Sequence, residues 1–152
     1  MRFIIILLCL LLICEAAYAE TVYILCQPDS YVNIRSAPKK SAEVIGWYEL
    51  GFECETDGVK KYGFLHLINL GLESETGWVN AGFVSRYPLT IETVKGYIQA
   101  DGRVACRRAV NGQRRKWLTD GAEVVIYARS DGWSITNQGF IQTAYLGGIL
   151  RQ

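Results

Sequence analysis

The sequence predicts an all-β protein made of two small barrels in tandem, preceded by a cleaved signal peptide. Three observations support this fold class. Short stretches rich in Val, Ile, Tyr, Phe and Thr are closed by Asp-Gly and other glycine turns, which is typical of strands joined by tight turns. No window of helical length carries an apolar stripe at i, i+3, i+4 and i+7. One order of motifs occurs twice along the chain, which indicates a repeated folding unit.

The first 19 residues have the pattern of a signal peptide. Arg2 precedes an unbroken apolar run over 3–14, which is too short for the about 20 apolar residues of a membrane-spanning helix. The triplet Ala17-Tyr18-Ala19 is the small-x-small pattern that a signal peptidase cleaves. We therefore expect an exported protein, periplasmic, cell-surface or extracellular, with no transmembrane anchor in the mature chain.

The first repeat covers 20–87 and opens with an alternating strand. In residues 31–35, Val32 and Ile34 should face a core while Asn33 and Arg35 face outward. A second apolar strand over 47–54 contains Gly51, and Asp57-Gly58 predicts a two-residue hairpin turn. About 12 extra residues then precede the closing strand at Gly77, and they predict an inserted apolar hairpin near 60–75.

The second repeat covers 94–152 and follows the same order with weaker motifs. Its strand over 103–107 is followed by a polar loop, an apolar strand over 117–124 and the turn Asp131-Gly132. The block starting at Gly77 is matched by the block starting at Gly139, at a constant offset of 62 positions. The matched positions are Val32/Val104, Arg35/Arg107, Trp47/Trp117, Gly51/Gly121 and Glu53/Glu123. The boundary should lie near 86–93, where Pro88 interrupts the β pattern. Five or so short strands in each repeat should close into a small barrel.

The segments YVNIRSAP, VIGWYELG, TDG and GWVNAGFVS resemble, in that order, the bacterial SH3 domain. The second repeat resembles it more loosely through RVACRRAV, WLTDGAEVVIYARSDGW and GFIQTAYL. The resemblance covers almost all of the mature chain, although the first repeat carries the extra residues and the second lacks the Ser-Gly-Pro turn. It implies tandem SH3-like barrels that recognise peptidoglycan peptides in a groove between loops. Tyr31, Asn33 and Arg35 lie on or beside the matching motif.

The sequence shows no pattern of catalytic or metal-binding residues, so we expect no enzyme, no metal and no cofactor. The chain contains one histidine, His66, which strand alternation places on the same face as Phe64 and Ile68, unless all three lie on an extended hairpin. A cysteine nucleophile needs a neighbouring imidazole, and Cys106 occupies the core-facing position of Ile34. Cys-x-x-Cys, His-x-x-x-His and Gly-x-Ser-x-Gly patterns are absent from the sequence.

Cys26, Cys54 and Cys106 would remain after cleavage of the signal peptide. An odd number excludes complete pairing within one molecule. One interpretation is a disulfide between Cys26 and Cys54 with Cys106 free, which an exported protein permits. The other is three buried thiols that act as small apolar residues.

Charge and aromatic residues define the candidate ligand surface. Residues 20–87 carry six Lys and Arg against nine Asp and Glu, and 88–152 carry nine against five, so the balances are −3 and +4. The basic residues bracket one loop of the second repeat, which either binds an anionic partner or is simply solvated or docked on the acidic first repeat. We expect exposed aromatic residues near loops of the first repeat to contribute, whereas Trp47, Trp117 and Trp133 should pack internally. The predicted ligand-binding residues are Tyr31, Asn33, Arg35, Tyr48, Tyr62, Arg108, Arg114 and Arg115.

The expected function is a non-catalytic cell-envelope binding module that recognises peptidoglycan or an associated wall polymer. The alternative is an exported protein-protein interaction module or inhibitor, which would bind another envelope protein through the inserted hairpin and the loops. Nucleic acid is not an expected partner, because the sequence indicates export and no recognition helix.

Overall fold

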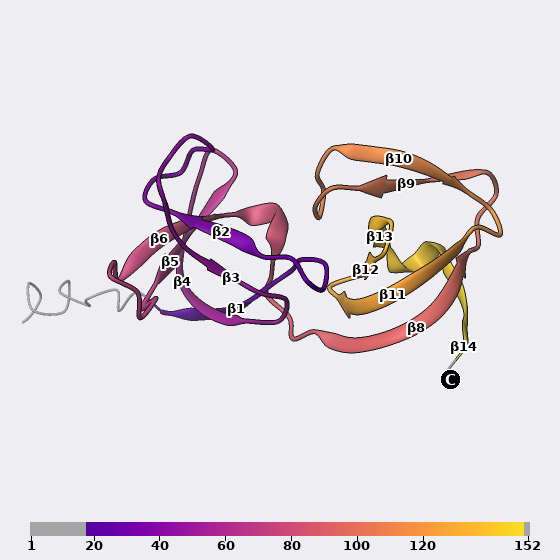
Figure 1. Cartoon of the computed structure of the whole chain (residues 1–152), viewed down its shortest axis with the longest axis horizontal. Helices are drawn as coiled ribbons and strands as arrows, with labels where there is room; N and C mark the ends of the chain where they lie inside the picture. The colour runs from indigo at the N-terminus through magenta and orange to yellow at the C-terminus, as the bar shows by residue number, and fades with distance from the viewer. Residues whose placement is uncertain (1–17, 151–152) are drawn as a thin grey trace, which may run out of the picture.

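The computed structural model describes residues 18–150, with side chains through residue 148. The predicted signal peptide lies outside the described residues except for its last two positions. The chain forms two antiparallel sheets of seven strands each, which lie side by side along the long axis of the molecule (Figure 1). Within residues 18–150, no helix is both long and apolar enough to cross a bilayer. The all-β prediction is therefore confirmed.

The first sheet is built from residues 20–85 in the order β3-β2-β6-β5-β4-β1-β7. Its strands are β1 (Glu20–Ile24), β2 (Val32–Arg35), β3 (Val44–Tyr48), β4 (Glu53–Lys61), β5 (Phe64–Ile68), β6 (Thr76–Asn80) and β7 (Val84–Ser85). A short 3₁₀ helix, η1 (Ala81–Phe83), joins the last two.

The second sheet is built from residues 90–150 in the order β10-β9-β13-β12-β11-β8-β14. Its strands are β8 (Thr90–Ile98), β9 (Arg103–Arg107), β10 (Arg114–Thr119), β11 (Glu123–Ser130), β12 (Trp133–Thr136), β13 (Gly139–Gln142) and β14 (Leu146–Leu150). The 3₁₀ helix η2 (Thr143–Tyr145) precedes the last strand.

The two sheets have the same strand order when each strand of the first is matched to the strand seven places later. In the first sheet β2, which ends at Arg35, lies between the edge strand β3 and the strand β6. In the second sheet β9, which ends at the matching Arg107, lies in the same way between β10 and β13. Both also insert a 3₁₀ helix before the last strand, and η1 and η2 are 62 positions apart. The repeat seen in the sequence is thus present in the topology.

Neither sheet is a closed barrel, which corrects the predicted architecture. β3 and β7 lie at opposite edges of the first sheet, and β10 and β14 do so in the second. β7 has only two residues, and both pair with β1, so β7 is too short to pair with β3 as well. The alternation of apolar residues predicts which side of a strand is buried, but it contains no information on whether two edges meet.

The turn predicted at Asp57-Gly58 is also wrong. These residues lie inside β4, at a bulge where the register with β5 shifts between Thr56 and Lys60. The chain reverses at Tyr62-Gly63 instead, where φ is 52° and 78°. Two successive positive φ angles define the type I′ hairpin turn. In the second sheet, Asp131-Gly132 takes those angles, 48° and 72°, as its sequence predicted.

Most apolar residues of the segment predicted as an inserted hairpin are buried, whereas half of its residues, all of them polar except Tyr62 and two glycines, are exposed. β5 pairs with β4 on one side and β6 on the other, and it contributes Leu65 and Leu67 to the first hydrophobic cluster. Leu70, in the loop after β5, is buried in the same cluster. The aliphatic residues on which the protein-interaction alternative depended are therefore largely buried, while Tyr62 at the β4–β5 turn stays exposed.

Three hydrophobic clusters stabilise the fold. One lies within the first sheet around Ile24, Ile34 and Leu67, and one within the second around Ile98 and Ile126. The third joins the two sheets, and its members from both halves are Leu25, Leu50, Phe83, Leu89, Val110, Ala128, Trp133, Ile135 and Phe140. Burial of apolar surface at this junction holds the halves in a fixed relation.

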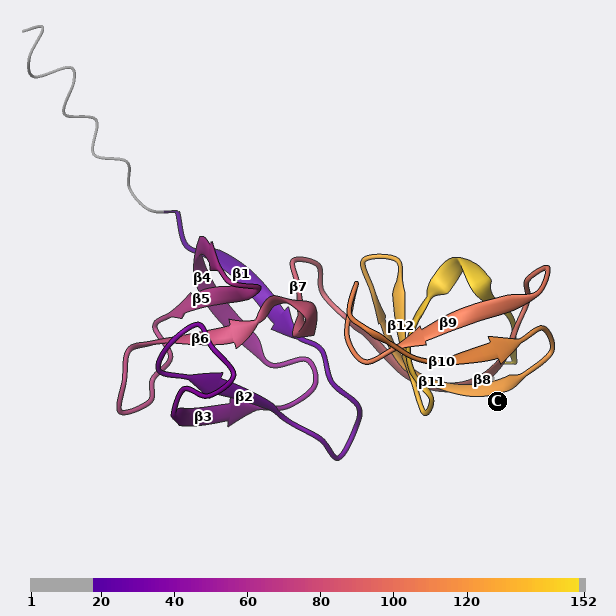
Figure 2. The same ribbon diagram turned by 90° about the horizontal axis from the view of Figure 1, so that it is seen from above.

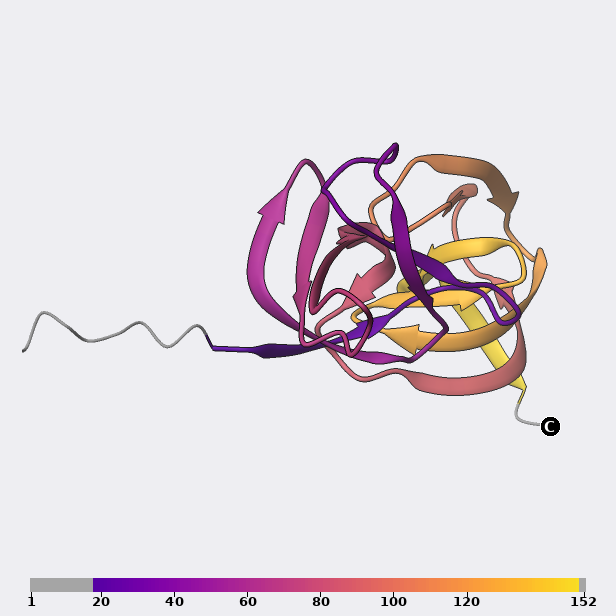
Figure 3. The same ribbon diagram turned by 60° about the vertical axis from the view of Figure 1, so that its left-hand side comes forward.

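Figures 2 and 3 show the ribbon of the two halves from two further directions. Polar contacts reinforce the junction between the two sheets. The N–H of Val110 donates to the carbonyl of Gly82 at 2.9 Å. The backbones approach so closely here that a Cβ on Gly82 would lie 3.0 Å from that of Ala109. The hydroxyls of Ser85 and Ser130, both buried, are 2.6 Å apart. A site lined by both halves can therefore have a defined shape.

Candidate functional site

A pocket of about 670 Å³ lies between the two halves of the chain. In the first half its walls come from the loops before and after β2, from β2, β5 and β6, and from η1. In the second half they come from β9, β10, the loop between them, and β13. Five of its lining residues are cationic, namely Arg35, Lys40, Arg107, Arg108 and Arg115, and no described Asp or Glu lines it. We call this site the cationic pocket.

Arg35 and Arg107 hold equivalent positions on the two walls. Each ends an alternating strand, and each pairs with the closing strand of its sheet, Arg35 with Trp78 and Arg107 with Phe140. Each guanidinium donates at 2.8 Å to a carbonyl of the following loop, that of Ala42 or Gly112. These bonds fix the two half-buried charges in place at the pocket wall.

Arg108, Arg115 and Lys40 carry charge that the protein leaves exposed. The ion pairs among residues 18–148 are His66–Asp57, Arg86–Glu20 and Arg129–Glu92, and none includes a pocket cation. One guanidinium nitrogen of Arg115 donates to the carbonyl of Gln138 at 3.4 Å, near the limit of a hydrogen bond. Guanidinium groups with free donors bind carboxylate and phosphate in a bidentate manner.

The rest of the pocket wall is aromatic and amide. Phe83 and Phe140 meet edge to face with ring centroids 6.0 Å apart, where the two halves join. Asn33 and Asn80 add amide groups, and the Asn80 side chain accepts a hydrogen bond from the N–H of Gly82. A ligand with an anionic group and an apolar or polar body therefore matches this site chemically.

Five of the eight predicted ligand-binding residues line the cationic pocket. Tyr31, Asn33 and Arg35 reach it from the first half, and Arg108 and Arg115 from the second. The structure thus brings together residues that the sequence had assigned to two separate loop surfaces.

The other three predicted residues lie elsewhere. Tyr48 is only 7% exposed, donates its hydroxyl to the carbonyl of Leu70 at 2.9 Å and belongs to the core. Tyr62 is exposed at the β4–β5 turn and lies outside the pocket lining. The Arg114 guanidinium lies 4.4 Å from the ring centroid of Trp117 and is also outside that lining.

The tryptophan prediction is right for one residue and wrong for two. Trp133 is buried at the junction of the sheets. Trp47 and Trp117 are 55% and 44% exposed, because each lies on an edge strand, β3 or β10, and faces outward. The prediction rested on the position of each tryptophan in or beside an apolar strand, and that position does not show which face of the strand the side chain occupies.

Sequence reasoning missed Lys40 and Arg107 as pocket residues. Arg107 aligns with Arg35 in the repeat, so that alignment was the signal that could have identified it. Lys40 sits in the loop between β2 and β3, and no motif distinguishes it from the neighbouring Lys39.

Cys26, Cys54 and Cys106 are free and buried, so the Cys26–Cys54 disulfide is not formed. Cys54 lies opposite Val22 in the β1–β4 ladder, and the Cys26 thiol donates to the Ser30 carbonyl. Burial raises the pKa of the Cys26 thiol to about 11, with a smaller contribution from Glu49, and that of Cys54 to about 12. Burial also raises the pKa of Cys106. The alternative of three buried thiols is the one the structure supports.

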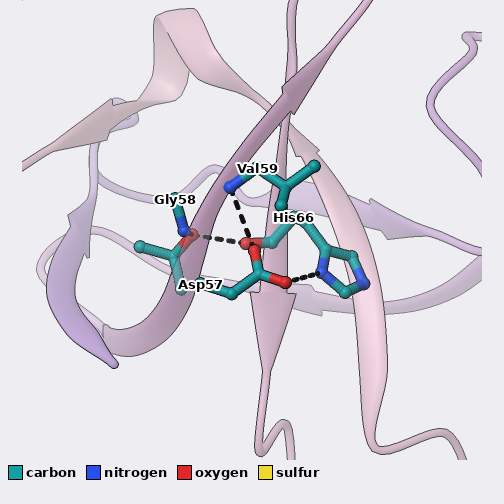
Figure 4. Close-up of polar contacts among 5 residues, drawn as sticks. Asp57, Gly58, Val59 and His66 are labelled. Atoms are coloured by element: carbon teal, nitrogen blue, oxygen red, sulfur yellow. Dashed lines mark hydrogen bonds and ion pairs between the residues drawn. The ribbon is translucent and has the colours of Figure 1, made fainter. Parts of the chain in front are cut away.

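His66 lies on the outer face of the first sheet, paired with Asp57 (Figure 4). Its Nδ1 is 2.7 Å from Oδ2 of Asp57, and its ring lies 4.7 Å from that of Trp78. Partial desolvation acts to raise the pKa of Asp57. The hydrogen bonds from His66 and from the N–H of Val59, together with the histidine charge, outweigh it and hold that pKa below its ordinary value. The β4 bulge is what brings Asp57 to His66.

Over residues 18–148, no three His, Cys, Asp or Glu side chains converge as metal ligands would.

No protein-family model matches the sequence, and no curated protein matches it. The solved structures that are similar include two from Trichomonas vaginalis. NlpC1 is 14% identical with a TM-score of 0.38, over 91% of this chain and 49% of that one. NlpC2 is 12% identical with a TM-score of 0.39, over 88% and 49%.

The expectation that the protein is not an enzyme is corrected by this comparison. Both similar structures are named NlpC proteins, and this chain spans about half the length of each. We withdraw that expectation and assign no reaction to the chain.

Proposed function

We propose that this protein is a binding module of the cell envelope, and that it holds an anionic group of peptidoglycan or of an associated wall polymer in the cationic pocket. The observation that carries the proposal is the charge of that pocket, which is lined by five cations from both halves and by no described carboxylate. Neutralising such a cluster with an anionic ligand removes the repulsion among the guanidinium groups.

Each half would act as a divergent bacterial SH3-like unit. The motif YVNIR, which carries the family resemblance, forms the β2 wall of the pocket. Its counterpart RVACR forms the β9 wall, so the ligand would contact equivalent strands of the two repeats. We further propose that the protein acts outside the cytoplasm, where such a polymer is found.

Cosedimentation with purified sacculi tests the proposal. The informative variant is Arg108→Ala with Arg115→Ala, because both side chains are exposed and neither forms an ion pair among the described residues. The matched control is Lys60→Ala with Lys61→Ala, which removes the same two charges from β4, outside the pocket.

We expect the unaltered protein to cosediment at low salt and to be released as salt screens the contact. The pocket variant should lose about tenfold or more in affinity. A hydrogen bond to a charged group contributes about 1.5 to 3 kcal/mol, and water and salt weaken the bonds made by exposed side chains such as these. The lysine control should bind as the unaltered protein does. Absence of binding at low salt, or equal losses in both variants, would overturn the proposal.

A further inference from the structure

A second, larger hollow lies on the other side of the loop that precedes β2. It measures about 900 Å³ and, like the cationic pocket, is lined by both halves of the chain. The two hollows share Gln27, Ser30, Tyr31 and Asn33, so this loop is the partition between them. A single ligand that crosses the partition would reach both.

Three aromatic side chains line this hollow. Tyr31 and Trp47 are both largely exposed, with ring centroids 5.7 Å apart and planes inclined by 47°, so that they form a corner. Tyr127, from β11, lines the hollow from the second half. We call this site the aromatic groove.

The charge of the aromatic groove is opposite to that of the cationic pocket. Asp29 and Glu49 line it, and no described Lys or Arg does. Both carboxylates are exposed and form none of the ion pairs among the described residues. Asp29 takes a left-handed φ of 59°, in the turn where the N–H of Ser30 bonds to the carbonyl of Gln27. The loop geometry thus holds this carboxylate at the groove.

Aromatic faces beside carboxylates favour a cation. An ammonium group gains from the negative face of each ring and from the nearby carboxylates, and aromatic corners of this kind bind organic cations. An anionic ligand group would meet no cationic side chain among the described lining residues and would be repelled by the two carboxylates, and an uncharged group would leave both carboxylates without an ionic partner.

From these observations we infer that the protein takes a zwitterionic ligand, whose anionic group lies in the cationic pocket and whose amino group lies in the aromatic groove. The inference rests on the proposed function and narrows its ligand to wall fragments that carry both a free acid and a free amine. The opposite charges on the two sides of one loop would also fix the direction in which the ligand lies.

The test uses muropeptides released from purified sacculi, with their amino groups either free or acetylated, and calorimetric measurement of the dissociation constant. Acetylation removes the positive charge and leaves the acids. The groove variant is Asp29→Asn with Glu49→Gln, and the control is Glu123→Gln, an exposed carboxylate on β11 that lines neither hollow.

We expect the unaltered protein and the control to bind the free-amine form about tenfold more tightly than the acetylated form. The groove variant should bind the two forms equally. The Arg108→Ala, Arg115→Ala variant should weaken binding of both forms by the same factor and keep the preference.

Two results would overturn the inference. One is equal binding of both forms by the unaltered protein, and the other is a preference that survives in the groove variant. If both forms bind with the same affinity, and the Arg108→Ala, Arg115→Ala variant weakens that binding, only this inference fails and the proposed function stands. If the unaltered protein binds neither form, the proposed function fails with it.

Discussion

Replacing Phe140 by alanine should show whether the junction between the two sheets holds the molecule together. Phe140 is 3% exposed, belongs to the cluster shared by both halves and meets the Phe83 ring edge to face. Truncation of a buried phenylalanine costs about 3 to 5 kcal/mol, including the cavity it leaves. The lost ring pair adds about 1 kcal/mol. Water can enter the vacated space from the cationic pocket, which Phe140 also lines, and this lowers the cavity cost.

We therefore expect Phe140→Ala to lower the free energy of unfolding by about 3 to 4 kcal/mol. For a chain of this size the midpoint of thermal unfolding should fall by about 10 to 15 °C. Urea and thermal denaturation, followed by near-ultraviolet circular dichroism, measure both quantities.

The matched control is Phe52→Ala. Phe52 stacks on Tyr48 with centroids 4.0 Å apart, but it is 47% exposed and takes no part in the junction. Its truncation should cost about 1.5 kcal/mol, because half of the ring already contacts water. The reasoning is refuted if the two variants lose the same stability to within about 0.5 kcal/mol, since the junction would then contribute nothing special.

Three further results are expected. Tyr48→Phe should cost about 1 to 2 kcal/mol of stability by leaving the buried carbonyl of Leu70 without its donor, while ligand affinity stays unchanged in the sacculus assay. Because the folded pKa of Asp57 is lowered, its contact with His66 contributes stability that is complete above the unfolded value of about 3.9 and is lost as the pH falls through the folded pKa. Asp57→Asn should therefore flatten the decline of urea midpoints below about pH 4, and an unchanged decline would contradict this. The three described cysteines should react with a thiol reagent slowly in the folded protein and completely in urea, and reductant should leave the unfolding midpoint unchanged.

The alternation of residues within a strand was readable from the sequence. Val32 and Ile34 are buried and Asn33 and Arg35 face outward, as their spacing predicts, because side chains alternate between the two faces of any strand. The repeat could also be predicted, because the same order of apolar strands and glycine turns occurs in both halves of the sequence even where the spacing between them differs. The hairpin turn at Asp131-Gly132, with its two positive φ angles, follows from local backbone preference alone.

Features that depend on residues distant in the chain could not be predicted from the sequence. Asp57-Gly58 has the same turn preference, yet it forms a bulge, because β4 resumes pairing with β5 at Lys60 and Lys61 after the register shift, and Tyr62-Gly63 takes the turn. Tyr48 was expected to be exposed near a loop, but its ring is buried in the core and its hydroxyl donates to the carbonyl of Leu70.

The sequence by itself determined the strands, the repeat and the excess of positive charge in the second half, because these follow from residue type and spacing. Only the tertiary structure decided that Arg35 and Arg107 line one pocket, and that a single loop separates five cations from two carboxylates. The physical reason is that both sites lie between the halves. Their geometry is set by the packing of Phe83, Phe140 and Trp133, and no pattern within either repeat encodes how the two repeats meet.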